Sequence, residues 1–151
     1  MQTTQQSILV LNGPNLNRLG KREIEIYGKQ GLEDIETLLN AHASKSGFAV
    51  DIDIRTSNHE GDLIDWIHEA DDQGMLAVLL NAGALTHTSL ALYDAIKAVS
   101  IPVIEVHISN PHARESFRSK SLIAGACRGT VQGFGIASYR LALDAALTLE
   151  Q

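Results

Sequence analysis

Cysteine is nearly absent from this sequence, and long apolar runs are absent altogether. Cys127 is the only cysteine, which excludes an internal disulfide and fits a reducing compartment. No apolar run approaches the ~18 residues that a membrane-spanning helix needs, and the polar start from Met1 to Ser7 differs from a signal peptide. We therefore expect a cytoplasmic protein without a membrane partner.

An excess of positive charge is missing as well. The chain has 12 lysines and arginines against 18 acidic residues, which gives a formal net charge of -6, and no long basic run interrupts this balance. This balance argues against a nucleic-acid partner. A length of 151 residues, without a visible linker or repeat, predicts one domain, residues 1–151, with a buried core.

The motifs of several common ligand sites are also missing. Six residues, rather than the four of a phosphate-binding P-loop, separate Gly13 from the next Gly-Lys pair, and neither G-x-G-x-x-G nor G-x-S-x-G occurs. His87, His107 and His112 could be considered as a metal trio, but no cysteine ligand accompanies them at short spacing. We expect neither a metal nor a cofactor.

What the chain does contain is an alternation of short apolar runs and helical patterns, which is typical of a parallel sheet flanked by helices. Strands are predicted at 8–11, 48–54, 76–80, 103–106 and, weakly, 130–131. The second strand alternates apolar and polar residues and is expected at an edge, whereas the uniformly apolar third is expected in the centre.

Helices are predicted between these strands. One runs from near Gly31 to Ser46, and the next follows a capping box at Ser57–Glu60. A third has an apolar face that includes Leu90 and Ile96. A short helix is predicted to carry Arg114 and Arg118, and a last one covers 136–149.

A long connection follows the first strand and carries Arg22 and Tyr27. Loops of this length in compact domains are usually lids or disordered segments. Gly20 and Gly28 allow unusual backbone angles near its ends. We predict a mobile lid over about residues 18–28.

Polar residues gather where three predicted strands end. Asn12 and Asn15 follow the first strand, residues 81–87 follow the third, and residues 107–109 follow the fourth. Ligands of open parallel sheets bind beyond the carboxyl ends of the strands, at the point where the strand order switches direction. The sequence therefore predicts an active site at this edge.

A phenol beside a guanidinium can serve as a base. Ionising a phenol at neutral pH costs about 4 kcal/mol, and a guanidinium about 4 Å away supplies a stabilisation of similar size at an effective dielectric of about 20. Arg22 precedes Tyr27 by five residues, which suits this role. The alternative is that Tyr27 caps a turn and Arg22 is a solvated charge. The lysines lie in polar contexts, so an imine mechanism is not expected.

Four motifs extend this interpretation: residues 12–20, the Arg22-Glu23 pair ahead of Tyr27-Gly28, residues 81–89 and residues 105–110. Together they resemble the type II 3-dehydroquinate dehydratases, in order and over nearly the whole chain. The resemblance implies a flavodoxin-like, doubly wound α/β fold with a five-stranded parallel sheet in the order 2-1-3-4-5. It also implies a hydro-lyase that converts 3-dehydroquinate to 3-dehydroshikimate by cofactor-independent trans-dehydration through an enolate, in the shikimate pathway of aromatic amino-acid biosynthesis or in quinate catabolism.

The resemblance further implies catalytic roles. Tyr27 is the base that removes the C2 proton, and Arg22 keeps it ionised. His107 is the acid that protonates the departing C1 hydroxyl, and Glu105 orients it. Asn15 holds a water that hydrogen-bonds to the enolate oxygen.

Substrate contacts are implied for further residues. The backbone amides of Ile108 and Ser109 bind the substrate carboxylate together with Asn81. His87 and Arg118 hold the substrate hydroxyls. Each of these residues follows one of the predicted strands, which agrees with the expected location of the site.

Arg114 is implied as a partner of the lid, and Asp94 as a residue that reaches a neighbouring subunit's site in a dodecamer of trimers. An acidic residue on a helix surface is otherwise most often solvated. Two alternatives stay open: a flavodoxin-like binding or receiver module, which would need a phosphate- or flavin-binding loop after the first strand, and an inactive interaction protein. The second would be expected to lack Tyr27, Arg22 or His107, and none is missing.

Overall fold

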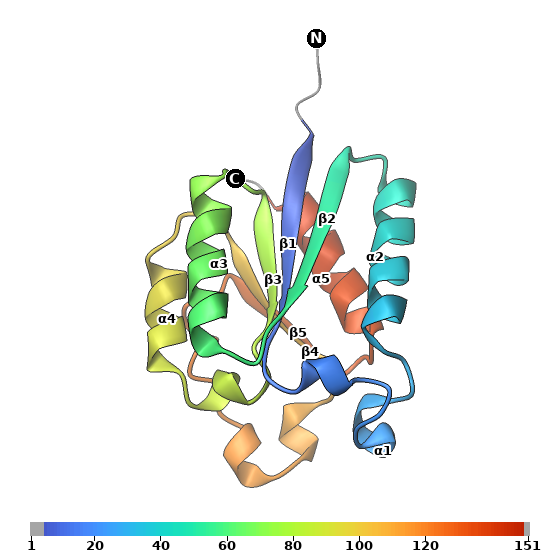
Figure 1. The fold of residues 1–151 in the computed structure, drawn as a ribbon, viewed down its shortest axis with the longest axis vertical. Helices are drawn as coiled ribbons and strands as arrows, with labels where there is room; N and C mark the ends of the chain where they lie inside the picture. The colour runs from blue at the N-terminus through green and yellow to red at the C-terminus, as the bar shows by residue number, and fades with distance from the viewer. Residues whose placement is uncertain (1–4, 150–151) are drawn as a thin grey trace.

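A computed structural model describes residues 5–149 and contains a five-stranded sheet in the order β2-β1-β3-β4-β5 (Figure 1). All four strand pairings are parallel. The sheet confirms the predicted α/β fold class and strand order. The strands are β1 (Gln6–Asn12), β2 (Val50–Thr56), β3 (Ala77–Asn81), β4 (Val103–His107) and β5 (Gly129–Gln132).

Helices cover both faces of the sheet. One face packs against α2 (Leu32–Ser46) and α5 (Ala137–Thr148), and the other against α3 (Glu60–Asp72) and α4 (Leu90–Lys97). The central strands are apolar throughout because both of their faces are buried. In β1, for example, Ile8 and Val10 join the core under α2 and α5, and Leu9 joins the core under α3 and α4.

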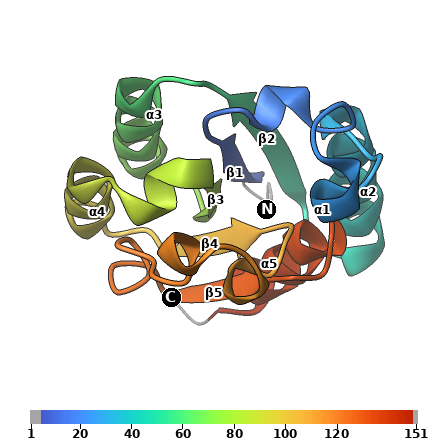
Figure 2. The same cartoon turned by 90° about the horizontal axis from the view of Figure 1, so that it is seen from below.

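The remaining short helices lie at the carboxyl end of the sheet. They are α1 (Ile24–Tyr27) and the 3-10 turns η1 (Leu16–Arg18), η2 (Gly83–His87), η3 (Pro111–Ala113) and η4 (Ser116–Arg118). Figure 2, which looks onto this end, shows them arranged around the strand ends. The predicted lid segment is therefore partly helical, and Tyr27 lies at the end of the single turn of α1.

The predicted capping box before α3 is wrong. His59 is the N-cap of α3 and makes no side-chain cap, while Ser57 Oγ accepts the His59 N–H (2.9 Å) and donates to Asp62 (2.6 Å). The carboxylate of Glu60 instead accepts a hydrogen bond from Ser89 Oγ (2.6 Å) at the start of α4. The Glu60 carboxylate, which a capping box would have used within α3, thus forms a contact between α3 and α4.

Two other predictions need correction. Arg114 and Arg118 do not share one helix, because the chain is extended at Arg114 (φ -112°, ψ -160°) between η3 and η4. Leu90 does not belong to the apolar face of α4: its side chain is 66% exposed, and the helix buries Leu92, Ala95 and Ile96 instead. Among residues 5–149, no helix has the length and apolar character needed to cross a membrane.

Candidate active site

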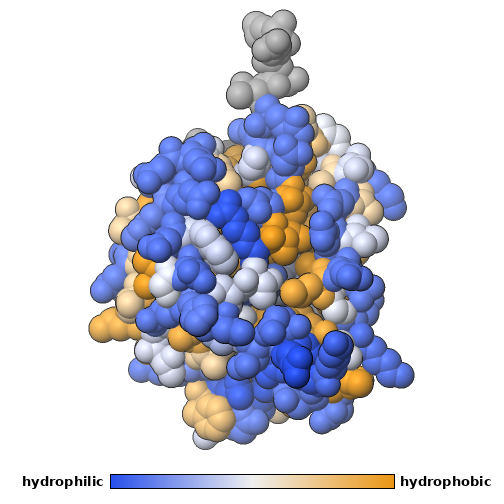
Figure 3. All heavy atoms as spheres, in the orientation of Figure 1, coloured by the Kyte–Doolittle hydropathy of each residue, from blue (hydrophilic) through white to orange (hydrophobic). Residues whose placement is uncertain are grey.

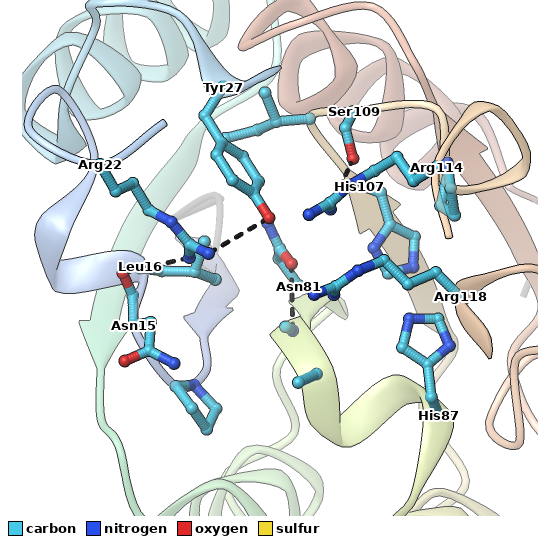
Figure 4. Close-up of a pocket in the computed structure, with 15 residues that line it drawn as sticks. Asn15, Leu16, Arg22, Tyr27, Asn81, His87, His107, Ser109, Arg114 and Arg118 are labelled. Atoms are coloured by element: carbon cyan, nitrogen blue, oxygen red, sulfur yellow. Dashed lines mark hydrogen bonds between the residues drawn. The ribbon is translucent and has the colours of Figure 1, made fainter. Parts of the chain in front are cut away.

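A pocket opens at the carboxyl end of the sheet, where β1 and β3 lead in opposite directions (Figure 4). Its lining comes from the predicted lid segment and from the loops after β1, β3 and β4. Ten of the predicted site residues line it together: Asn15, Arg22, Tyr27, Asn81, His87, His107, Ile108, Ser109, Arg114 and Arg118.

Two glycines allow the loops after β1 and β3 to meet under this pocket. A Cβ on Gly13 would lie 2.6 Å from the carbonyl oxygen of Ala82. A Cβ on Gly83, where φ is +59°, would lie 2.9 Å from the carbonyl oxygen of Pro14. Both distances are shorter than side chains tolerate, so glycine is required for this approach. The loop then continues through Asn15, whose backbone is left-handed (φ 70°).

Tyr27 points into the pocket with Arg22 against it. An Arg22 N–H donates to the phenol oxygen at 3.3 Å, and the guanidinium carbon lies 4.1 Å from the ring centroid. The same guanidinium reaches the carbonyl oxygen of Asn15 (3.4 Å) and the carboxylate of Glu23 (3.3 Å). The contact between Arg22 and Tyr27 agrees with the proximity that their spacing suggested.

A second guanidinium lies near the same ring. The guanidinium carbon of Arg114 is 5.0 Å from the centroid of Tyr27, and one of its N–H groups donates to Ser109 Oγ (3.3 Å). The Nε of Arg114 is buried, and within residues 5–149 it has no hydrogen-bond partner. Arg114 thus brings a second positive charge close to the Tyr27 ring.

His107 is held by an acid behind it. Its Nε2 lies 2.7 Å from Glu105 Oε2, and the Glu105 side chain is only 2% exposed. The other carboxylate oxygen, Oε1, accepts a hydrogen bond from Ser121 Oγ at 2.8 Å. Since Nε2 is engaged with Glu105, Nδ1 is the ring nitrogen left to act on a ligand.

Asn81 is fixed by a buried chain of hydrogen bonds beneath the pocket. Its Nδ2 donates to the hydroxyl of Tyr139 (2.8 Å), which donates to Asn12 Oδ1 (2.6 Å). Its Oδ1 accepts the N–H of Gly83 (3.2 Å). Complete burial raises the pKa of Tyr139, so this hydroxyl remains a neutral donor.

The opposite wall carries His87 and Arg118. His87 Nδ1 lies 2.8 Å from the carbonyl oxygen of Lys120, so Nδ1 carries the proton in the neutral ring and Nε2 is an acceptor. The Arg118 guanidinium donates to Glu115, and this hydrogen bond lowers the pKa of the Glu115 carboxyl. Figure 4 shows both side chains across the pocket from Arg22.

Two predicted residues do not line the pocket. Glu105 lies behind His107, as expected for an orienting residue, and Asp94 lies on the exposed side of α4. The role of Asp94 in a neighbouring subunit stays a prediction. Within residues 5–149 no three His, Cys, Asp or Glu side chains are arranged to hold a metal ion.

Three polar residues that support the site were missed from the sequence. Tyr139 and Ser121 hold Asn81 and Glu105, and the Asn58 side chain accepts the N–H of Asn15 (2.8 Å). The position of Tyr139 inside a predicted helix was a weak signal, because its burial is known only from the structure. Asn58 and Ser121 had none, because polar residues in loops are ordinary.

Comparison with known proteins decides the family. A model of the family described as dehydroquinase class II matches residues 6–147. The chain belongs to this family. A protein of Rhizobium johnstonii named 3-dehydroquinate dehydratase is 61% identical over 140 residues, which cover 93% of this chain and 94% of the relative. A Thermus thermophilus protein of the same name is 54% identical and covers 90% of each chain.

Solved structures agree with this membership of the class II dehydroquinases. The type II dehydroquinase of Butyrivibrio crossotus superimposes with a TM-score of 0.91 at 41% identity, covering 95% of this chain and 99% of that one. The type II dehydroquinase of Propionibacterium acnes gives a TM-score of 0.87 at 39% identity, covering 97% and 99%. The resemblance read from the four motifs is confirmed, as is the α/β fold that it implied.

Proposed function

We propose that this chain is a hydro-lyase that dehydrates 3-dehydroquinate to 3-dehydroshikimate. The observation that carries the proposal is the Tyr27 phenol, which faces one pocket with His107 and is contacted by Arg22. Relatives of 52–61% identity bear the name of this activity, which supports it from a separate direction. The proposed reaction is a trans-elimination that proceeds through an enolate and needs no cofactor.

The first step is removal of the C2 proton by the Tyr27 phenolate. The guanidinium of Arg22, 3.3 Å from the phenol oxygen, stabilises the phenolate, and Arg114 adds a second positive charge at the ring. The electron pair left on C2 moves to the substrate carbonyl oxygen and forms the enolate. A water held by Asn15 donates a hydrogen bond to that oxygen.

In the second step the enolate electron pair forms the C1=C2 double bond and the carbonyl is restored, while the C1–O bond breaks and the hydroxyl leaves as water. His107 donates its Nδ1 proton to the departing oxygen, while Nε2 keeps its proton and its hydrogen bond to Glu105. The ring therefore starts as an imidazolium, and the Glu105 carboxylate stabilises its positive charge. After the step the ring is neutral and Tyr27 carries a proton, so one proton must return from the phenol to the imidazole through water.

Charge in the pocket suits an anionic substrate. The lining includes three arginines and, among the described residues, no acidic side chain. The backbone amides of Ile108 and Ser109, together with Asn81, would bind the carboxylate, while His87 Nε2 and Arg118 would hold the ring hydroxyls. Arg114 would close on the substrate as a partner of the lid, residues 18–28.

The wider setting follows from the same proposal. Residues 1–151 form a single catalytic domain that acts in the cytoplasm, in the shikimate pathway of aromatic amino-acid biosynthesis or in quinate catabolism. The chains assemble into a dodecamer of trimers, in which Asp94 of one chain reaches the site of its neighbour.

A spectroscopic assay tests the reaction. Purified protein is mixed with 3-dehydroquinate, and the ultraviolet absorbance of the conjugated enone product is followed. Tyr27→Phe should lower kcat by about 10²- to 10⁴-fold, because it removes the base and little else. Tyr93→Phe, which removes a phenol hydroxyl outside the pocket, is the matched control and should retain wild-type turnover. No enone from the wild type would refute the activity, and full turnover by Tyr27→Phe would refute the base.

A further inference from the structure

The orientation of His107, the proposed acid, depends on the position of the Glu105 carboxylate. Glu105 lies on β4 and is buried, so its two carboxylate oxygens depend on protein donors rather than on solvent. Oε2 meets the ring of His107 and Oε1 meets the hydroxyl of Ser121. A glutamate has three side-chain torsions, and the His107 contact alone does not fix them.

The hydroxyl of Ser121 is itself fixed. Its Oγ accepts the backbone N–H of Ala124 at 3.0 Å, which uses one lone pair and leaves the single proton free for Glu105 Oε1. A serine hydroxyl without such a second contact could rotate away from the carboxylate. Here the contact with Ala124 selects the orientation that donates to Glu105.

The backbone on either side of Ser121 is anchored to a different part of the site. The carbonyl oxygen of Lys120 receives the Nδ1–H of His87 (2.8 Å), and the N–H of Leu122 donates to the carbonyl oxygen of Thr86 (2.8 Å). Residues 120–122 are therefore tied to η2 independently of Glu105. In this arrangement Ser121 is the fixed partner and the carboxylate is the group that is oriented.

We propose that Ser121 is a positioning residue for the acid step: it holds Glu105 so that the carboxylate presents His107 to the leaving hydroxyl. The inference rests on the proposed dehydration. Ser121 does not line the substrate pocket, so its effect passes through Glu105 and His107. Outer groups that orient a metal-bound imidazole commonly change affinity or activity by about 10- to 100-fold when removed. We expect an effect of that size for an acid as well, because small displacements of an acid slow proton transfer.

Steady-state kinetics of three variants test the proposal. Ser121→Ala should lower kcat by about 10- to 100-fold and leave KM within about two-fold, since the substrate contacts stay in place. Ser121→Thr, which keeps the hydroxyl, should recover most of the loss. Ser119→Ala is the matched control: it removes a neighbouring hydroxyl that, within residues 5–149, donates to the carbonyl oxygen of Ser116 in its own turn, and it should behave as the wild type.

The results that overturn the proposal are distinct. Unchanged kcat in Ser121→Ala would show that Glu105 needs no second contact. A loss shared equally by Ser121→Thr, or a rise in KM that matches the fall in kcat, would assign Ser121 a merely structural part.

Crystal structures of the wild type and of Ser121→Ala give a readout that needs no activity. We expect the Glu105 carboxylate to turn away in the variant and its contact with His107 to lengthen beyond hydrogen-bond distance. An unmoved pair would refute the positioning role. A wild type with no dehydratase activity would instead refute the proposed function, and this structural comparison would still decide what Ser121 does.

Discussion

At the scale of single residues, the charge around Tyr27 is not cancelled nearby. Arg22 has Glu23 as its acidic partner, but that side chain is 48% exposed and its charge is screened by solvent. Arg114 donates to Ser109, which is neutral. Two guanidinium groups, those of Arg22 and Arg114, therefore lie against the ring of Tyr27.

Tyr139 offers a prediction at the same scale. Tyr139→Phe removes the hydroxyl that links Asn12 to Asn81 and leaves both amides short of a buried partner. We expect a loss of about 1–3 kcal/mol in the free energy of unfolding. We also expect a rise in KM that exceeds the fall in kcat, because Asn81 is proposed to bind the substrate carboxylate.

Denaturant unfolding and steady-state kinetics measure the two effects. Tyr93→Phe is the control, since Tyr93 lies on α4 and outside the pocket. Equal KM values for wild type and Tyr139→Phe would contradict the proposed link between the buried chain and substrate binding.

At the scale of elements, the site depends on the contact between the loops after β1 and β3. The Gly13 N–H donates to the carbonyl oxygen of Asn81 at 2.8 Å. The two loop backbones approach so closely that neither Gly13 nor Gly83 can carry a side chain. The loop after β1 carries Asn15 and leads into the segment with Arg22 and Tyr27. Within that segment α1 is a single turn closed at Gly28 (φ +80°).

Gly13→Ala tests this contact. The new methyl group would lie 2.6 Å from the carbonyl oxygen of Ala82, so the two loops must separate. We expect a loss of at least about 1–3 kcal/mol in the free energy of unfolding together with a large fall in kcat/KM. Gly61→Ala is the matched control: its Cβ meets nothing within 4 Å near the start of α3, and alanine there should stabilise by up to about 1 kcal/mol. Wild-type activity in Gly13→Ala would show that the loops tolerate separation.

The regular elements were predictable from the sequence because their signal is local. A period of 3.6 predicted the longer helices, and a period of 2 predicted the second strand. Buried strands such as β3 were predicted from uninterrupted apolar runs, whereas β5 had only a weak signal. The turns η1 and η2 and the helix α1 were not predicted, because elements of three to five residues show no complete period. Leu90 misled for a related reason: an apolar residue at the first position of α4 fits the pattern but points outward.

The residues that face the pocket could be predicted from motifs, whereas the residues behind them could not. Asn15, Tyr27 and His107 stand in distinctive local sequences. Tyr139 is 58 residues from Asn81, and Ser121 is 16 residues from Glu105, so their contacts exist only after the sheet has formed. Sequence spacing carries no information about partners brought together by the fold.

At the scale of the whole molecule, one chain leaves large apolar side chains in contact with solvent. Leu90 on α4, for example, is 66% exposed, and Phe48 at the other side of the molecule is 51% exposed. Figure 3 shows a mostly polar face on which apolar atoms reach the surface over the sheet between α3 and α2. Scattered exposure of this kind is ordinary in a monomer. Exposure alone therefore does not indicate a subunit interface, and the residues around each exposed side chain decide.

Leu90 has a neighbour with a proposed role. Asp94 follows it by four residues, which places both on one side of α4, and Asp94 is proposed to reach the site of another subunit. Burying a leucine against a partner is worth about 1.5–3 kcal/mol, and each closed interface of a trimer would repeat that gain. Both the proposed assembly, through Leu90, and the proposed substrate contact, through Asp94, thus depend on the exposed side of α4.

Leu90→Glu should therefore dissociate the assembly into smaller species, because burying an unpaired carboxylate in the interface opposes association. Dissociation would separate Asp94 from the neighbouring subunit's site, so kcat/KM should fall in the same protein. Light scattering coupled to size-exclusion chromatography measures the mass, and the enone assay measures the activity. Phe48→Glu, an equivalent change away from α4, should leave both unchanged. Asp94→Asn should keep the mass and lose activity. A Leu90→Glu protein of unchanged mass would place the subunit contact elsewhere and remove the basis for a shared site.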